Sequence, residues 1–231
     1  MQNKIKLAVF DIDGTLFRSA LIIQLIDHLV LNGIFPKEAK DEMEEDYLLW
    51  LNRQDSYDRY IKKVIEVHNK YIINCAEKDV IAVAEKVVDW QRDRVYTFTR
   101  DRVKEWKDEG YFLIAISGSP DYIVSKFTNC FGFNISYGSI CEVVNGFFTG
   151  KINADSAARK DEILRYFLRN SSVEVDLGES YGVGDTEGDI SFLSMVGKPI
   201  AFNPNRSLVK HAENNGWQII IERKDVIYQL S

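Results

Sequence analysis

The sequence predicts an α/β protein with a Rossmann-like parallel sheet, helices on both faces, and an all-helical cap inserted after strand one. From about residue 96 onward, short apolar runs alternate with helical patterns, which is typical of repeated β-α-β units. Residues 19–95 have helical periodicity and contain no convincing strand. We therefore expect an α/β core made of residues 1–16 and 96–231, and a helical cap made of residues 17–95.

The first elements follow from apolar runs and helix-capping signals. Residues 4–10 form an apolar run that predicts a buried strand. Ser19 can cap a helix that ends at Gly33, and Pro36 can begin a second helix. Apolar positions at helical spacing predict two further cap helices, over residues 56–72 and 79–90.

Two groups of cap residues have a structural and a functional interpretation. Four aromatic residues can line a substrate cleft, although their helical spacing is more typical of packing inside the cap: Trp50, Tyr57, Tyr60 and Trp90. The acidic run 41-DEMEED-46 is expected on a solvated helix face.

The remaining elements alternate between strand and helix. The predicted strands cover residues 111–117, 135–140, 180–185, 198–203 and 217–221. The predicted helices cover residues 120–132, 156–170, 187–197 and 205–216, with Pro120 suited to a first turn. Asn145 and Gly146 stand between two apolar runs and predict a hairpin.

Composition excludes several classes of protein. The chain has 231 residues, a net charge of -6 and a sequence pI near 5.2, which argues against broad binding to nucleic acid or to anionic membranes. Three cysteines without a C-x-x-C pair predict neither a disulfide framework nor a zinc site, and favour the cytoplasm. The most apolar segment, residues 20–31, is too short and too polar for a membrane span.

Carboxylates gather at the ends of predicted strands. The segments 11-DIDGT-15, 117-SGSP-120 and 184-GDTEGD-189 follow three different strands, and parallel strands bring their carboxyl ends to one edge. Asp11, Asp13, Asp185 and Asp189 would then share one crevice and repel each other in a low dielectric. Such a crevice requires cations.

A divalent metal and a lysine can supply this positive charge. Oxygen ligands from a few carboxylates suit Mg²⁺, which also shares ligation with phosphate. Three lysines lie in the chain between the second and third polar segments: Lys126, Lys151 and Lys160. Ser117 and the backbone amide of Gly118 can hydrogen-bond phosphate oxygens, and the helix that begins near Pro120 adds a favourable dipole.

These motifs, in this order and over essentially the whole chain, resemble those of the haloacid dehalogenase superfamily of phosphatases. The helical insertion resembles that superfamily's cap of the first type. Residues 144–152 and 198–217 are similar to the phosphoserine-phosphatase-like branch. The resemblance implies a Mg²⁺-dependent phosphatase that hydrolyses a small phosphorylated metabolite through an aspartyl-phosphate, and it implies that Lys160 is the motif lysine.

The resemblance also implies a role for each residue of the site. Asp11 is the nucleophile, and Asp13 is the general acid for the leaving alcohol and then the base that activates water. Asp11, the backbone carbonyl of Asp13, and Asp185 hold Mg²⁺, while Asp189 supports the metal site or orients the motif lysine.

Three residues are then left to bind the phosphoryl oxygens: Ser117, Gly118 and Lys160. Gly14 lets the backbone turn tightly beside the phosphate. Two alternatives to hydrolysis are a non-catalytic phosphate-binding or regulatory protein and a phosphomutase.

The chain departs from phosphoserine phosphatases at one position. Those enzymes have an acid nine residues after the nucleophile, facing the substrate ammonium, and Ala20 stands there in this sequence. This argues against phosphoserine as the substrate. Arg18 can instead favour a substrate with a second anionic group. No motif in the predicted cap names the substrate, and none indicates an oligomeric state.

Overall fold

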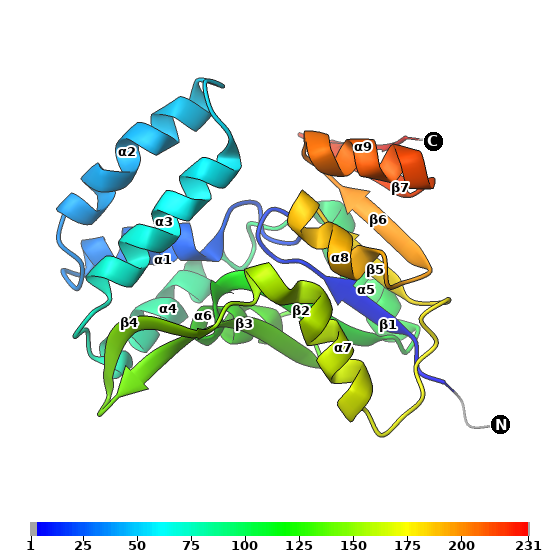
Figure 1. The fold of residues 1–231 in the computed structure, drawn as a ribbon, viewed down its shortest axis with the longest axis horizontal. Helices are drawn as coiled ribbons and strands as arrows, with labels where there is room; N and C mark the ends of the chain where they lie inside the picture. The colour runs from blue at the N-terminus through cyan, green and yellow to red at the C-terminus, as the bar shows by residue number, and fades with distance from the viewer. Residues whose placement is uncertain (1–3, 231) are drawn as a thin grey trace.

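A computed structural model describes residues 4–230, which contain one eight-stranded sheet of order β4-β3-β2-β1-β5-β6-β7-β8 (Figure 1). The strands are β1 (Leu7–Phe10), β2 (Phe112–Pro120), β3 (Ile135–Val144), β4 (Phe147–Ala154), β5 (Tyr181–Gly184), β6 (Lys198–Phe202), β7 (Gln218–Arg223) and β8 (Val226–Leu230). Strands β3, β2, β1, β5, β6 and β7 run parallel to one another, whereas the edge strands β4 and β8 are antiparallel to their neighbours. The predicted α/β class is confirmed.

Strand β1 lies in the middle of the sheet because its side chains are buried on both faces. Ala8 and Phe10 pack in one apolar cluster with α5 (Thr97–Asp108) and α6 (Asp121–Asn129). Leu7 and Val9 pack in a second cluster on the opposite face. The helices there are α7 (Lys160–Asn170), α8 (Ile190–Leu193) and α9 (Arg206–Asn215). Because β1 is parallel to β2 and β5, the residue after β1 lies where the carboxyl ends of those strands also lie.

The block after β1 is helical, as predicted. It contains α1 (Leu21–Leu31), α2 (Glu38–Leu51), α3 (Tyr57–Tyr71) and α4 (Glu77–Gln91). In Figure 1, α2 and α3 form a pair that leans away from the sheet. The chain enters and leaves the block side by side, since Tyr96 N donates to Leu16 O over 3.0 Å and Arg18 N donates to Arg94 O over 3.0 Å. This pairing supports our proposal that residues 17–95 form the cap.

A hairpin of the sheet also holds the cap. Asn145 and Gly146 have φ angles of 54° and 81°, so the predicted hairpin forms with a turn that requires left-handed residues. Strand β4 then pairs with the loop between α3 and α4: Asn74 N donates to Phe148 O over 2.8 Å, and Phe148 N donates to Cys75 O over 3.0 Å. The far end of the cap is therefore tied to the core.

Several predicted boundaries differ from the structure. The helix expected to begin at Pro36 begins at Glu38, and the helix expected over 187–197 is a 3-10 turn followed by the short α8. Strand β2 runs on to Pro120, so the second polar segment lies inside the strand end instead of after it. Pro120 is correspondingly the N-cap of α6 and not its first helical residue. Strand β8 was not predicted, because 226-VIYQL-230 is an exposed edge with no buried face to give a strong pattern.

None of the helices in the described part of the chain combines the length and the apolar character that a membrane span requires.

Candidate active site

Three neighbouring strands bring their polar ends together. Asp11 directly follows β1, Asp185 directly follows β5, and Ser117 lies near the end of β2. One carboxylate oxygen from each of Asp11, Asp185 and Asp189 lies within 4.8 Å of the others. The parallel register predicts this meeting, because β1 is hydrogen-bonded to both β2 and β5.

Asp11 is buried and has one oxygen without a partner. Its side chain is nearly inaccessible, with a residue exposure of 3%, and its backbone N donates to Val183 O over 2.9 Å. Oδ1 accepts a hydrogen bond from Lys160 Nζ over 2.6 Å. Among the described residues, Oδ2 is the one buried side-chain polar atom without a hydrogen bond. A buried acceptor left in this state calls for a ligand.

Lys160 is the lysine that the structure brings to the carboxylates. It is the first residue of α7, and its Nζ lies 2.6 Å from Asp11 Oδ1 and 2.5 Å from Asp189 Oδ1. The other two candidate lysines lie elsewhere: Lys126 pairs with Glu85 at the surface, and Lys151 is exposed on β4.

The charges of the cluster do not balance. Burial, together with the repulsion of Asp189 and Asp13, raises the pKa of Asp11 to about 7 against the attraction of Lys160. Burial and the charges of Asp11 and Asp189 likewise raise the pKa of Asp185 well above its ordinary value. One ammonium faces three carboxylates, and an oxygen of Asp11 remains unpaired. The donor set therefore fits a divalent cation.

Glycines and backbone amides fix the carboxylates in place. Gly14 has a φ of +87°, and a Cβ at this position would lie 2.2 Å from Asp185 Oδ2, so no other residue allows so close an approach. Asp189 Oδ2 accepts from the backbone N of Asp185 and of Thr186, each over 2.9 Å. Thr15 Oγ1 donates to Asp185 Oδ1 over 3.3 Å.

Asp13 lies in a separate hydrogen-bond network. Its Oδ2 accepts from Ser117 Oγ over 2.6 Å and from Ser119 Oγ over 2.8 Å, and its Oδ1 accepts from Leu21 N over 2.6 Å. Asp13 thus caps α1 from outside the helix. The prediction that Ser19 is the N-cap is wrong: Ala20 occupies that position and offers no side-chain acceptor.

Two serines of the second polar segment serve this network. The hydroxyl of Ser117, predicted to bind phosphate, here donates to Asp13. Ser119 was not predicted to belong to the site, although it is the second serine of the same SGS motif. It is 2% exposed, and its Oγ also accepts from Ile22 N over 3.2 Å. Gly118, between them, sits against Ala157, because a Cβ at Gly118 would lie 2.9 Å from that side chain.

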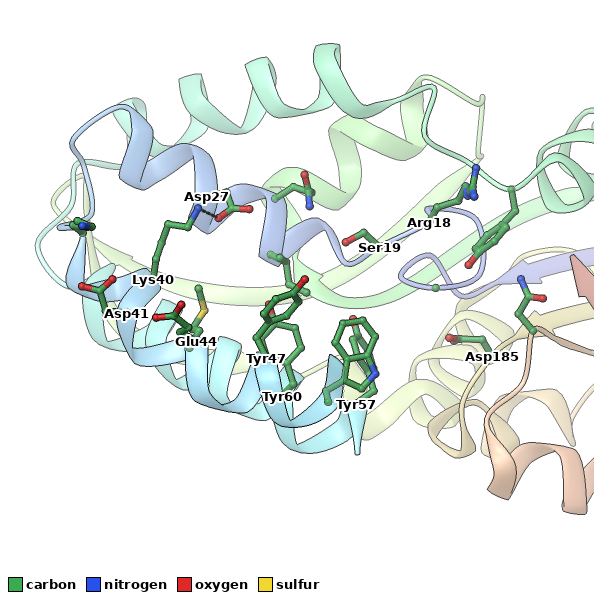
Figure 2. Close-up of a pocket in the computed structure, with 18 residues that line it drawn as sticks. Arg18, Ser19, Asp27, Lys40, Asp41, Glu44, Tyr47, Tyr57, Tyr60 and Asp185 are labelled. Carbon is green, nitrogen blue, oxygen red and sulfur yellow. Dashed lines mark ion pairs between the residues drawn. The ribbon is translucent and has the colours of Figure 1, made fainter. Parts of the chain in front are cut away.

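A cavity of about 910 Å³ extends from the carboxylates along the cap (Figure 2). Gly14 and Asp185 line its inner end, and it runs between α1 on one side and α2 and α3 on the other. Arg18 lies at the inner end with an exposed side chain, its guanidinium 5.5 Å from the ring centre of Tyr96. The cavity is large enough for a drug-sized ligand.

The cap aromatics divide between the two interpretations of their spacing. Trp50, Tyr57 and Tyr60 line the cavity and also pack against one another. Trp90 is 75% exposed and lies outside the cavity. The acidic run is exposed to solvent at Asp41, Glu44 and Glu45, as predicted, and Asp41 and Glu44 also line the outer part of the same cavity. The sequence pattern could not decide between the two interpretations, because a helix presents the same spacing to a cleft as to a core.

Comparisons with known proteins identify a family and similar phosphatases. A family model for haloacid dehalogenase-like hydrolases matches residues 8–194. The phosphoserine phosphatase of Methanocaldococcus jannaschii is 24% identical over 228 residues, which cover 98% of this chain and 96% of that protein. The histidinol-phosphatase of Neisseria meningitidis serogroup C is 24% identical over 111 residues, covering 46% of this chain and 50% of that protein.

Solved structures share the fold. A protein of unknown function from Bordetella pertussis Tohama I aligns with a TM-score of 0.72 at 21% identity, covering 95% of this chain and 99% of that one. A phosphoserine phosphatase, solved as an analogue of its phospho-aspartyl intermediate, aligns with a TM-score of 0.64 at 22% identity, covering 96% of each chain.

Proposed function

The chain belongs to the haloacid dehalogenase-like hydrolase family and to its phosphoserine-phosphatase-like branch, and on this premise we propose that this phosphatase hydrolyses a small phosphomonoester through an aspartyl-phosphate, with Mg²⁺ as cofactor. One observation carries the proposal. Asp11 has a buried, unpaired oxygen beside a lysine and two further carboxylates. This is the arrangement that a nucleophilic carboxylate requires, because its own charge and that of the phosphoryl group must both be neutralised.

We propose that Asp11 Oδ2 attacks phosphorus. A bond from this oxygen to phosphorus forms as the bond from phosphorus to the leaving oxygen breaks, and Asp13 gives its proton to that oxygen. In the second step water attacks phosphorus and passes a proton to Asp13. The aspartyl oxygen then leaves, which regenerates Asp11 and releases inorganic phosphate.

Neighbouring groups support these two roles. Lys160 holds the other oxygen of Asp11, which leaves Oδ2 as the attacking atom, and in our proposal its ammonium also binds the phosphoryl oxygens. Three donors fix the carboxylate of Asp13, so its orientation is set before substrate arrives. In our proposal Ser117 exchanges part of this contact for a phosphoryl oxygen, and the Gly118 amide binds another.

The carboxylates define which residues would hold the metal. We assign Asp11, the backbone carbonyl of Asp13, and Asp185 as ligands. Asp189 supports them, because it accepts from the amide of Asp185 and from Lys160. When bound, Mg²⁺ supplies positive charge that favours ionised Asp11 and offsets the charge of the phosphoryl group.

Hydrolysis of 4-nitrophenyl phosphate tests the proposed function. We expect activity that is lost in EDTA and restored by excess Mg²⁺. The absence of metal-dependent hydrolysis would contradict the proposal and favour a non-catalytic phosphate-binding protein. Phosphate transfer to an added sugar phosphate, in place of release as inorganic phosphate, would instead identify a phosphomutase.

Ser119→Ala is expected to lower kcat about tenfold and to change KM by less than about twofold, because Asp13 loses one donor while the phosphate-binding groups remain. The α1 amide of Ile22 also loses its acceptor, so we expect Tm to fall by a few degrees. Steady-state kinetics and thermal unfolding measure both effects.

Two variants control for this result. Ser119→Thr keeps a hydroxyl and is expected to recover part of kcat, whereas Ser125→Ala removes a hydroxyl that is bonded within α6 and is the matched control. A kcat unchanged in Ser119→Ala would contradict the positioning role.

Phosphoserine is not the expected substrate despite the similarity to phosphoserine phosphatases. Ala20 is 1% exposed at the start of α1, and its methyl side chain cannot bind a substrate ammonium as an acid would. We also propose a cytoplasmic location, which the free thiols of Cys75, Cys130 and Cys141 support.

A further inference from the structure

Four aromatic rings form one continuous side of the cavity, which we call the aromatic wall: Tyr47, Trp50, Tyr57 and Tyr60. The Trp50 and Tyr60 rings are nearly parallel, with an interplanar angle of 8° and centroids 5.8 Å apart. Trp50 and Tyr57 have centroids 5.2 Å apart, and Tyr47 and Tyr60 have centroids 5.5 Å apart. Figure 2 shows the labelled tyrosines in a row across the cavity from α1.

The aromatic wall begins beside the carboxylates of the site. Tyr57 and Asp185 line the same cavity, and Figure 2 shows Tyr57 as the labelled tyrosine on the side of Asp185. Burial, followed by the negative charges of Asp13 and Asp185, raises the pKa of the Tyr57 hydroxyl. Along α2 the wall continues outward from Trp50 to Tyr47, about one helical turn or 5 Å further on. A group attached to a bound phosphate would therefore meet the wall immediately.

The opposite side of the cavity is mostly polar. Ser19, Ile23 and Gln24 line it from the first turns of α1, so one aliphatic side chain stands among a hydroxyl and an amide. At the outer end Lys40 Nζ pairs with Asp27 Oδ1 at 2.6 Å. The two charges offset each other, while Arg18, Lys37, Asp41 and Glu44, which also line the cavity, are exposed to solvent.

The size of the cavity also bears on the ligand. About 910 Å³ far exceeds what a phosphate and a short hydroxy-amino acid fill, and such a substrate would leave most of the wall bare. A flat ring would stack on the wall with its face and present its polar edge to Gln24 and Ser19. Aromatic faces favour this offset or parallel stacking.

We propose that the substrate is a phosphomonoester whose leaving alcohol carries a flat aromatic or heteroaromatic ring, and that the aromatic wall selects it. The inference rests on the proposed phosphatase function and names its substrate class.

Matched pairs of phosphomonoesters test the wall. The first pair is adenosine 5'-monophosphate and methyl riboside 5-phosphate, which share the reacting bond and differ in the base. The second pair is 2-phenylethyl phosphate and 2-cyclohexylethyl phosphate, which have alcohols of similar size. We expect the aromatic member of at least one pair to have a kcat/KM about tenfold or more above its partner.

Variants then locate the origin of this preference. Trp50→Leu is expected to bring the ratio within a pair to near one, and Trp50→Phe to restore part of it. Trp90→Leu is the matched control, since this exposed tryptophan lies outside the cavity, and it should leave the ratio unchanged. Ratios within a pair are insensitive to partial loss of folded protein, so a destabilised variant still reports selectivity.

Three results would overturn the inference. One is a ratio near one in both pairs for the wild type, and another is a preference that survives Trp50→Leu. A third is a kcat/KM for phosphocholine above that of both aromatic members, which would show that the wall binds a cation. Metal-dependent hydrolysis of the aliphatic members in any of these cases would leave the proposed function standing, whereas no hydrolysis of any ester would remove both.

Discussion

Replacing Asp11 with asparagine is expected to lower kcat/KM by at least about a thousandfold, because the amide oxygen is a poor nucleophile and forms no stable phosphoryl intermediate. The substitution keeps the size of the side chain and the acceptor for Lys160 Nζ. Steady-state hydrolysis of 4-nitrophenyl phosphate with saturating Mg²⁺ measures the loss. Wild-type activity in Asp11→Asn would contradict the assignment of the nucleophile.

The same variant is expected to unfold less readily than the wild type when metal is chelated. The pKa of Asp11 is about 7 in the folded protein, above its ordinary value of 3.8, so the fold favours the protonated form. Its contribution to stability is complete below about pH 4 and is lost as pH rises through 7. Asp11→Asn should therefore gain stability over the wild type at about pH 8 in EDTA, with a difference that shrinks toward about pH 5.

Denaturant unfolding at both pH values, with and without Mg²⁺, measures this difference. It also separates the loss of activity from a failure to fold, since an inactive but more stable protein has lost only its chemistry. Greater stability of the wild type in EDTA at about pH 8 would contradict the account of a self-repelling cluster.

Lys160→Met is expected to abolish activity and, in EDTA at neutral pH, to destabilise the protein by about 3–5 kcal/mol, the usual cost of leaving buried charges without their partner. Nζ contacts both Asp11 and Asp189, and the residue is 7% exposed. Burial lowers the pKa of Lys160, but the two carboxylates outweigh it and raise the pKa above its ordinary value. The ammonium is therefore charged wherever the enzyme works.

Two variants control for this result. Lys126→Met removes a lysine that pairs with Glu85 at the surface, and it should change stability by less than about 1 kcal/mol. Lys160→Arg keeps the charge but not the compact geometry, so stability should recover more than activity. Mg²⁺ should return part of the stability lost in Lys160→Met. Equal effects of Lys160→Met and Lys126→Met would contradict the central place of Lys160.

The sequence was sufficient to predict which strand ends meet, because parallel strands end at one edge. It could not predict which way each side chain turns after its strand. Asp11 and Asp13 stand two residues apart, but the chain leaves β1 at Phe10 and turns at Gly14, so Asp11 joins Asp185 while Asp13 turns toward α1. The expected cluster of four acids is therefore a cluster of three, with Asp13 beside it in a separate hydrogen-bond network.

Long-range contacts account for the other differences. Ser19 has the local chemistry of an N-cap, but Asp13 and Ser119 reach the first amides of α1 from other elements. Such contacts leave no periodic pattern in the sequence. For a related reason the sequence could not distinguish a cavity lining from cap packing. Trp50 and Tyr57 belong both to the packing of the cap and to the lining of the cavity.

The covalent intermediate gives the most direct test of the central claim, that Asp11 carries the phosphoryl group during turnover. The wild-type protein is mixed with substrate and Mg²⁺, quenched in acid within one turnover, reduced with borohydride, and digested for peptide mass spectrometry. We predict homoserine at position 11, which is the product that borohydride forms from an aspartyl-phosphate. It should be absent when Mg²⁺ is omitted and absent in Asp11→Asn. Continued turnover with no modification at Asp11, or with modification at another residue, would contradict the account.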